Sequence, residues 1–127
     1  MPALRKVAST NHLNQQVLQS ACVVNDTLER LSARWKMQVL YSIDQGNNRF
    51  TLLKDLFPSL SDHVLGQRLH ALQAEHLVSR HPNPAVVPPQ VQYFTTPKGE
   101  ALLAIMRALT EWEQLFAEAL VEESAAA

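Results

Sequence analysis

Hydrogen-bonding side chains without a carboxylate gather on one side of a helix expected at residues 61–75. At about 100° per residue, the apolar stripe of this helix consists of Leu65, Leu69 and Leu72. The opposite face consists of His63, Gly66, Gln67, His70 and Ala74. Solvated helix faces commonly alternate glutamate and lysine, whereas this face has neither. Because imidazole and amide groups can hydrogen-bond to base edges, the pattern indicates a helix that enters a DNA major groove.

Four residues of this segment have more specific interpretations. Ser61 is expected to be the N-cap of the helix. Gln67 is either an ordinary surface glutamine or the best base-reading candidate, since its amide can contact N6 and N7 of adenine together. Gly66 costs about 1 kcal/mol relative to alanine inside a helix, which either close approach of the backbone to DNA or a close helix crossing would explain. Arg68 suits a phosphate contact or an intramolecular ion pair.

The elements that position this helix follow from hydrophobic periodicity and from turn residues. Periodic apolar positions predict helices at 4–19, 21–31, 34–43, 50–57 and 61–75, and from Pro97 through Phe116. Gly46 can take the positive φ that ends the third helix, and Thr96 is expected to cap the last one. Two short β-branched or aromatic runs, 77–80 and 91–95, predict a hairpin around an irregular, proline-rich loop at 82–89.

This order predicts a mainly α fold of the α+β class. It is a winged helix-turn-helix with a two-stranded wing and additional N- and C-terminal helices. The 127 residues suit one compact domain. We expect a helical extension at 1–20 and the winged helix-turn-helix domain, with its C-terminal helix, at 21–127.

From Cys22 to Leu103 the chain resembles the HxlR-type winged helix-turn-helix transcriptional regulators of bacteria. The matching residues are, in order, Cys22, Arg34-Trp35, Gly46, Arg49-Phe50, Leu53, Phe57-Pro58, Leu60-Ser61, Val64-Leu65, Gln67-Arg68-Leu69, Leu72, Leu77-Val78, Arg80, Pro88-Pro89, Val91, Tyr93, Thr96-Pro97, Gly99 and Leu102-Leu103. Each match is weak alone, but together they form a specific signature because their order and spacing are kept.

The resemblance implies a homodimeric DNA-binding regulator. The helix from Ser61 would lie in the major groove and the wing at 80–93 along the DNA backbone or minor groove. Two such helices would read a near-palindromic operator with half-sites roughly 34 Å apart. The DNA-binding residues expected on this basis are Arg49, Ser61, His63, Gly66, Gln67, Arg68, His70 and Arg80.

The resemblance also assigns the terminal helices to dimerisation. The apolar positions of the last helix continue beyond what a three-helix core could cover, so a monomer would expose a large apolar patch. The residues expected at the dimer interface are Leu13, Val17, Met106, Leu109, Trp112 and Phe116. The first half of the last helix could instead pack on its own domain.

The sequence departs from the family pattern at four positions. His63 stands where lysine is common, Gly66 where threonine is common, Gln90 where the wing often has arginine, and His76 where glycine is usual. Two cationic contacts are thereby lost, which predicts modest non-specific affinity and a shallow salt dependence of DNA binding. The wing is about two residues longer than usual, so no base-reading role is assigned to Val86 or Val87.

Cys22 is the single cysteine, at the position where some regulators of this family sense electrophiles or oxidants. A place in the first turn of a helix would lower the pKa of its thiol, whereas burial by Val23 and Val24 would raise it. It is therefore either a sensor or an inert packed thiol. Without a second cysteine, oxidation would give a disulfide across the dimer, a mixed disulfide or an adduct.

Other chemistries find little support in the sequence. His63 and His70 lie about 10 Å apart along the helix, too far to share one ion, so we expect neither a metal site nor a cofactor. No nucleophile with a base, no paired acids and no phosphate-binding glycine loop appears, so we do not expect an enzyme. The alternative function is a winged-helix module that binds protein without binding DNA. Such a module would more commonly present a large apolar anchor on the outer face of helix 61–75.

The charge distribution permits a nucleic-acid partner. The net charge is −1, but residues 111–127 carry −5 and residues 1–110 carry +4. No stretch approaches the roughly 18 apolar residues of a membrane span, and the first residues lack the apolar stretch of a secretory signal. We therefore expect a cytoplasmic protein that does not associate with a membrane.

Overall fold

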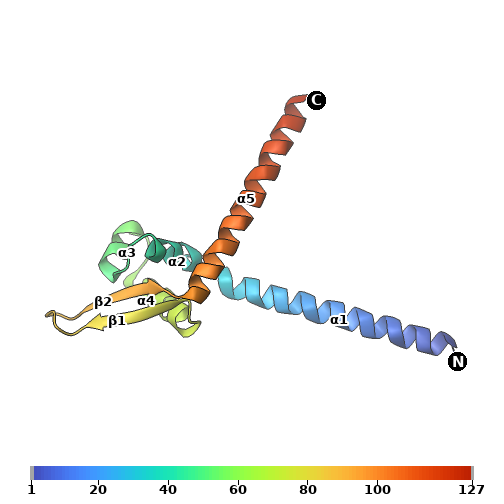
Figure 1. Cartoon of the computed structure of the whole chain (residues 1–127), viewed down its shortest axis with the longest axis horizontal. Helices are drawn as coiled ribbons and strands as arrows, with labels where there is room; N and C mark the ends of the chain where they lie inside the picture. Colours follow the sequence, from blue (N-terminus) through green and yellow to red (C-terminus); the bar gives the residue numbers. More distant parts are fainter. Residues whose placement is uncertain (1, 127) are drawn as a thin grey trace. The chain divides into compact units, whose positions relative to one another are not determined.

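The computed structural model describes residues 2–126, and it describes the side chains of residues 13–125. The chain forms two units, Met1–Met37 and Gln38–Ala127. The elements are α1 (Pro2–Leu31), α2 (Lys36–Asp44), α3 (Phe50–Leu56), α4 (Asp62–Ala74), β1 (Val78–Asn83), β2 (Gln90–Thr95) and α5 (Pro97–Ala126) (Figure 1). The expected winged helix-turn-helix architecture, mainly α with a two-stranded wing, is confirmed.

The first unit is built on one helix rather than two. The sequence predicted helices at 4–19 and 21–31, but α1 runs without a break through Ser20 and Ala21. The prediction was wrong because the chain has neither glycine nor proline between Pro2 and Leu31, so nothing stops the helix. The end of α1 is fixed by the buried Lys36, whose Nζ donates a hydrogen bond to the Arg30 carbonyl at 2.9 Å.

The helix predicted at 34–43 begins later than expected. Trp35 has a φ of +73°, in the left-handed region, so α2 starts only at Lys36. The Arg34 guanidinium lies 5.3 Å from the centre of the Trp35 ring. At the other end, Gly46 has a φ of +102°, which confirms the expected glycine stop.

The largest buried side chains of the second unit come from four helices, and Val78 of β1 adds to the same core. Its largest fully buried side chains are Val39, Leu40, Leu53, Leu65, Leu72 and Leu103. Burial of each side chain contributes about 1.5–3 kcal/mol. The three buried residues of α4, which are Leu65, Leu69 and Leu72, form the predicted apolar stripe. This stripe determines which face of α4 points outward.

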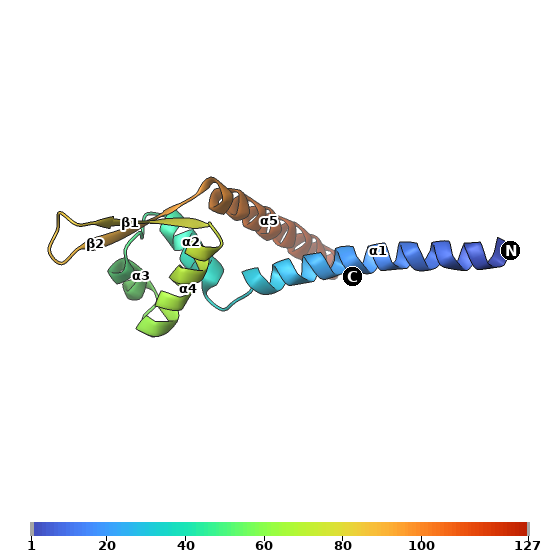
Figure 2. The ribbon, with the colours of Figure 1, turned by 90° about the horizontal axis from the view of Figure 1, so that it is seen from below.

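The wing is longer than the sequence predicted. β1 and β2 pair antiparallel from Val78 opposite Thr95 to Asn83 opposite Gln90, and Pro82 lies within the ladder opposite Val91. The prediction that an irregular loop starts at Pro82 was therefore wrong, since Pro82 and Asn83 belong to β1. In a two-stranded sheet both strands are edges, so a proline that lacks an N–H is tolerated. Figure 2 shows this hairpin extending beyond α3 and α4.

The start of α5 is held by a close contact with the end of the helix-turn-helix. Thr96 Oγ1 accepts a hydrogen bond from the Gly99 amide at 3.0 Å and donates one to the His76 carbonyl at 2.6 Å, which confirms the expected N-cap. A Cβ at Gly99 would overlap the Leu77 carbonyl. His76, where the family usually has glycine, has a left-handed φ of +60°.

Replacement of Gly99 by alanine is therefore expected to lower the free energy of unfolding by about 1–3 kcal/mol, because backbone rather than a flexible side chain must move. Gly66→Ala is the matched control. Its Cβ would meet nothing within 4 Å among the described residues, so the free energy of unfolding should rise by up to about 1 kcal/mol. Urea denaturation measures both changes, and equal effects of the two substitutions would contradict this explanation.

Candidate DNA-binding surface

The outward face of α4 is held in place at the start of the helix. The Ser61 side chain accepts a hydrogen bond from the Val64 amide at 3.1 Å, so the expected N-cap is confirmed. The backbone carbonyl of Ser61 accepts a second hydrogen bond, from the Leu65 amide at 3.0 Å. Together with the buried leucines, these contacts fix both the beginning and the rotation of α4.

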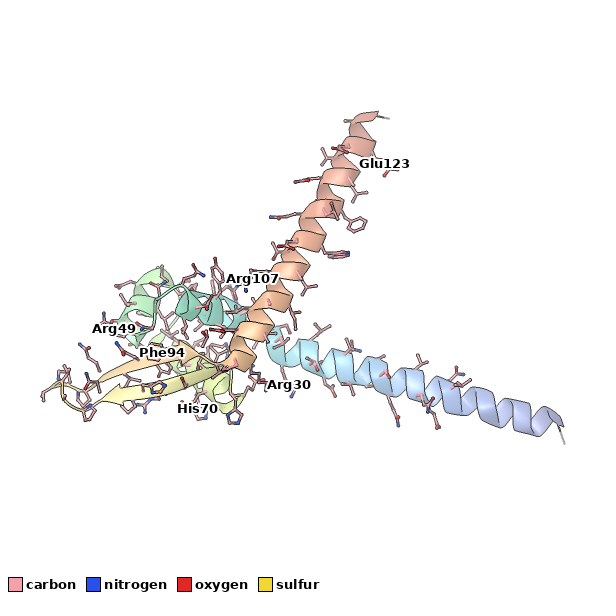
Figure 3. The ribbon with its side chains drawn as sticks, in the orientation of Figure 1. Arg30, Arg49, His70, Phe94, Arg107 and Glu123 are labelled. Atoms are coloured by element: carbon pink, nitrogen blue, oxygen red, sulfur yellow. The ribbon has the colours of Figure 1, made fainter. Side chains whose placement is uncertain are left out.

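The outer face of α4 carries a shallow open depression. It is lined by Asp62, His63, Gly66, Gln67, Arg68 and His70. The side chains of His63, Gln67 and His70 are exposed, and Arg68 is half-buried. Figure 3 shows His70 pointing away from the body of the unit. The structure therefore brings together the α4 residues predicted to bind DNA.

Gly66 has no neighbour that would explain its presence by packing. A Cβ there would have open space around it, with no atom of the described chain within 4 Å. The helix crossing, one of the two explanations from the sequence, is therefore wrong for this chain. The other interpretation from the sequence, close approach of the α4 backbone to DNA, stays a prediction.

Asp62 adds a carboxylate beside a face that the sequence predicted to have none. It lines the depression, and its side chain is 76% exposed. Its Oδ1 lies 3.5 Å from Nζ of Lys54, which also donates a hydrogen bond to the Leu60 carbonyl. Lys54 thereby links α3 to the start of α4 and offsets the negative charge beside the depression. Sequence reasoning missed this residue, because its partners lie across the turn between two helices.

The other two arginines predicted to bind DNA lie outside the depression. Arg49 is the N-cap residue of α3, and its side chain makes no capping hydrogen bond. Figure 3 shows Arg49 near the start of α3. Arg80 is exposed on β1, opposite Tyr93. The Tyr93 amide donates a hydrogen bond to the Asn48 carbonyl at 2.8 Å, which ties the wing to the residues before α3.

Both terminal helices expose apolar side chains. The large exposed ones on α1 are Leu13, Val17, Leu18, Val23, Val24 and Leu28. Those on α5 are Ile105, Leu109, Trp112, Leu115, Phe116, Leu120 and Val121. The Trp112 and Phe116 rings lie 6.0 Å apart. Of the predicted interface residues, only Met106 is half-buried within this chain. Near the start of α5, Leu103 is buried in the core, whereas the described side chains from Arg107 to Ala125 are all exposed.

Cys22 is exposed and lies inside α1, far from either end of the helix. The expected place in a first helical turn was wrong, since α1 begins at Pro2 rather than near Ala21. Val23 and Val24 are themselves exposed, so they do not bury the thiol within this chain.

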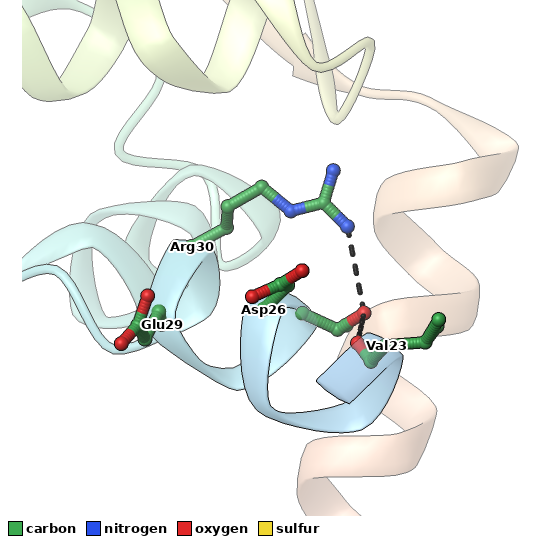
Figure 4. Close-up of a pocket in the computed structure, with 5 residues that line it drawn as sticks. Val23, Asp26, Glu29 and Arg30 are labelled. Atoms are coloured by element: carbon green, nitrogen blue, oxygen red, sulfur yellow. Dashed lines mark hydrogen bonds between the residues drawn. The ribbon is translucent and has the colours of Figure 1, made fainter. Parts of the chain in front are cut away.

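A second hollow lies along α1, close to Cys22 in sequence. It is lined by Val23, Asp26, Thr27, Glu29 and Arg30 (Figure 4). Thr27 Oγ1 donates a hydrogen bond to the Val23 carbonyl at 2.8 Å and accepts one from Arg30 at 3.4 Å.

Among the residues with described side chains, no group of three or more His, Cys, Asp or Glu could hold a metal ion. No described helix is long and apolar enough to span a membrane.

A helix-turn-helix formed by α3 and α4, with a hairpin wing before a long closing helix, defines a winged helix-turn-helix protein. The HxlR-like helix-turn-helix family matches residues 30–120. The chain belongs to this family.

Individual relatives agree with this assignment. The HTH-type transcriptional regulator YkvN of Bacillus subtilis (strain 168) is 37% identical over 77% of this chain and 82% of its own length. A transcriptional regulator of the MarR family from Enterococcus faecalis V583 is 28% identical, with a TM-score of 0.70 over 77% of this chain and 88% of that one. The redox regulator HypR in its reduced form is 31% identical, with a TM-score of 0.64 over 72% of this chain and 89% of its own.

Proposed function

We propose that this protein is a sequence-specific DNA-binding transcriptional regulator that acts as a homodimer. The observation that carries the proposal is the outer face of α4. His63, Gln67 and His70 are exposed beside a glycine with open space around it, on a helix fixed by a buried leucine stripe. A major groove accepts one helix, and its base edges accept hydrogen bonds from imidazole and amide groups.

The eight candidate DNA-binding residues divide into three roles. His63, Gln67 and His70 contact base edges, while Gly66 lets the α4 backbone approach the DNA. Arg68 on α4, Arg49 before α3 and Arg80 on β1 contact phosphates, as does the backbone around Ser61 at the positive end of the helix dipole. Base contacts set the sequence preference, and phosphate contacts set the position of the protein on the duplex.

The exposed apolar side chains of α1 and α5 support a dimer. Leu13 and Val17 on α1, and Leu109, Trp112 and Phe116 on α5, are each at least half exposed in the single chain. A soluble monomer rarely exposes so many large apolar side chains on a single helix. Met106, which is half-buried in the single chain, is the sixth residue predicted at the dimer interface. A two-fold symmetric dimer presents two α4 helices, which then read a near-palindromic operator with half-sites roughly 34 Å apart.

The alternative, a winged-helix module that binds protein instead of DNA, is less well supported. The depression on α4 is lined by charged, imidazole and amide groups and by a glycine, without a large apolar anchor. Hot spots of protein interfaces are enriched in tryptophan, tyrosine and arginine in desolvated pockets. We also infer that the protein acts in the cytoplasm, where its DNA partner lies, and that it works without a metal or cofactor.

Mobility-shift assays with fragments of the upstream region of its own gene test the proposal. We expect one fragment to be bound with at least about 10³-fold preference over unrelated DNA of the same length. Equal binding to all fragments, or no binding, would refute a sequence-specific regulator.

A response to oxidants or electrophiles through Cys22 is a second proposal. The thiol is exposed in this chain, and one structural neighbour is a redox regulator. Addition of a quinone to the thiolate would place one quinone on each chain and leave no thiol to titrate. We expect mass spectrometry to find this adduct together with release of DNA, and Cys22→Ala to abolish both. If Cys22→Ala still releases DNA on quinone treatment, Cys22 is not the sensor.

A further inference from the structure

An open cavity lies between the start of α3 and the tip of the wing. Its volume is about 450 Å³, within the range of small-molecule sites in proteins. It is lined by Arg49, Phe50, Thr51, Val86, Val87, Pro88, Pro89, Gln90 and Val91. The proposed DNA-reading face of α4 contributes none of these residues, so the cavity is separate from the depression on that helix.

The lining combines apolar walls with a single cationic group. Phe50, the valines and the prolines form most of the surface, while Arg49, Thr51 and Gln90 supply the polar side chains. No carboxylate lines the cavity, and the chain has no charged residue from His81 to Pro97. The guanidinium of Arg49 therefore has no anionic partner on the wing.

Arg49 carries a buried donor that lacks an acceptor. Its Nε is buried and makes no hydrogen bond within the part of the chain that the structure describes. Its side chain also makes no capping bond to α3. The side chain as a whole is only half-buried and lines the cavity, and a carboxylate is the acceptor that pairs best with a guanidinium.

We propose that this cavity binds small organic carboxylates with an aromatic or branched apolar body. The carboxylate would accept hydrogen bonds from Arg49, and the apolar body would contact Phe50, Val86 and Val91. An inorganic phosphate would satisfy the guanidinium but would leave the apolar walls without a partner. A neutral apolar molecule would fill the walls but would leave the guanidinium of Arg49 without an anionic partner.

A ligand at this position would also compete with DNA. It would occupy the Arg49 guanidinium, to which the proposed function assigns a phosphate contact. It would also fix the tip of the wing against α3. This competition rests on the proposed function, whereas binding of the carboxylate by the free protein does not.

Titration of the free protein followed by ¹H–¹⁵N NMR tests the site, with benzoate as the probe and with benzamide and acetate as controls. Benzoate should shift the Arg49 Nε–Hε signal and the amides of Thr51, Gln90 and Val91. Benzamide lacks the charge and acetate lacks the apolar body, so both should bind at least about tenfold more weakly. Benzoate that leaves these signals unchanged at millimolar concentration would overturn the proposal.

Two variants separate a specific site from general anion binding. Arg49→Gln should weaken benzoate binding about tenfold or more, whereas Arg107→Gln, on the exposed part of α5, should leave it unchanged. Equal effects of the two variants would overturn the site.

A mobility shift with and without benzoate tests the competition. Weaker DNA binding in benzoate but not in benzamide is expected, and unchanged DNA binding with the NMR shifts present would overturn the competition alone. A protein that binds no DNA would refute the proposed function, while the NMR titration would still report on the cavity.

Discussion

Gln67→Ala is expected to weaken operator binding about 5- to 150-fold, because a bidentate amide contact with one base contributes about 1–3 kcal/mol of discrimination. The preference for adenine at one position in each half-site should be lost as well. Gln67 is exposed on the outer face of α4, so the substitution removes no contact of the core. Fluorescence anisotropy on the operator and on single-base variants of it measures both effects.

Gln73→Ala is the matched control for this experiment. Gln73 belongs to the same helix and is equally exposed, but it does not line the depression. Its replacement should change operator affinity less than twofold, about 0.4 kcal/mol. Equal losses for Gln67→Ala and Gln73→Ala would mean that α4 stabilises the complex without reading bases through the predicted face.

Phe116→Asp is expected to convert the dimer into monomers and to lower operator affinity by about 10²- to 10⁴-fold, because the gain from linking two half-sites is lost. Phe116 is 53% exposed in the single chain and its ring lies tilted beside that of Trp112, so the aspartate does not disturb the core of the monomer. In a dimer it would place an unpaired carboxylate in an apolar interface. Analytical ultracentrifugation measures the dissociation, and circular dichroism checks that the chain stays folded.

Gln114→Asp introduces the same charge two residues earlier, at about 160° from Phe116 around the helix. It should leave both the dimer and DNA binding intact. A Phe116→Asp protein that still sediments as a dimer would show that the exposed apolar side chains around Phe116 on α5 are not part of the interface.

The features that the sequence predicted well depend on neighbouring residues. The caps at Ser61 and Thr96 and the positive φ of Gly46 each involve contacts within about four positions along the chain. The leucine stripe of α4 follows from helical periodicity alone, and it fixes the outer face of that helix. The orientation of the candidate site was therefore predictable from local pattern.

The features that the sequence predicted poorly depend on contacts across turns or on the absence of a stop signal. Trp35 has a left-handed φ, which tryptophan rarely adopts, and α2 therefore begins later than predicted. Pro82 fits into the wing because β1 pairs with a strand on one side only. The contact between Lys54 and Asp62 joins two helices across a tight turn. The cavity beside Arg49 joins residues about 40 positions apart, which no local pattern reveals.

Photocrosslinking from α4 shows whether the outer face of this helix lies against DNA bases. A photoreactive p-benzoylphenylalanine would replace His63, Gln67 or His70 in turn, and Gln73 as the control, in the full chain bound to its operator. We predict crosslinks to bases from the first three positions and none from Gln73. If none of the three positions reaches DNA while the complex itself still forms, this face of α4 does not bind DNA and the account is contradicted.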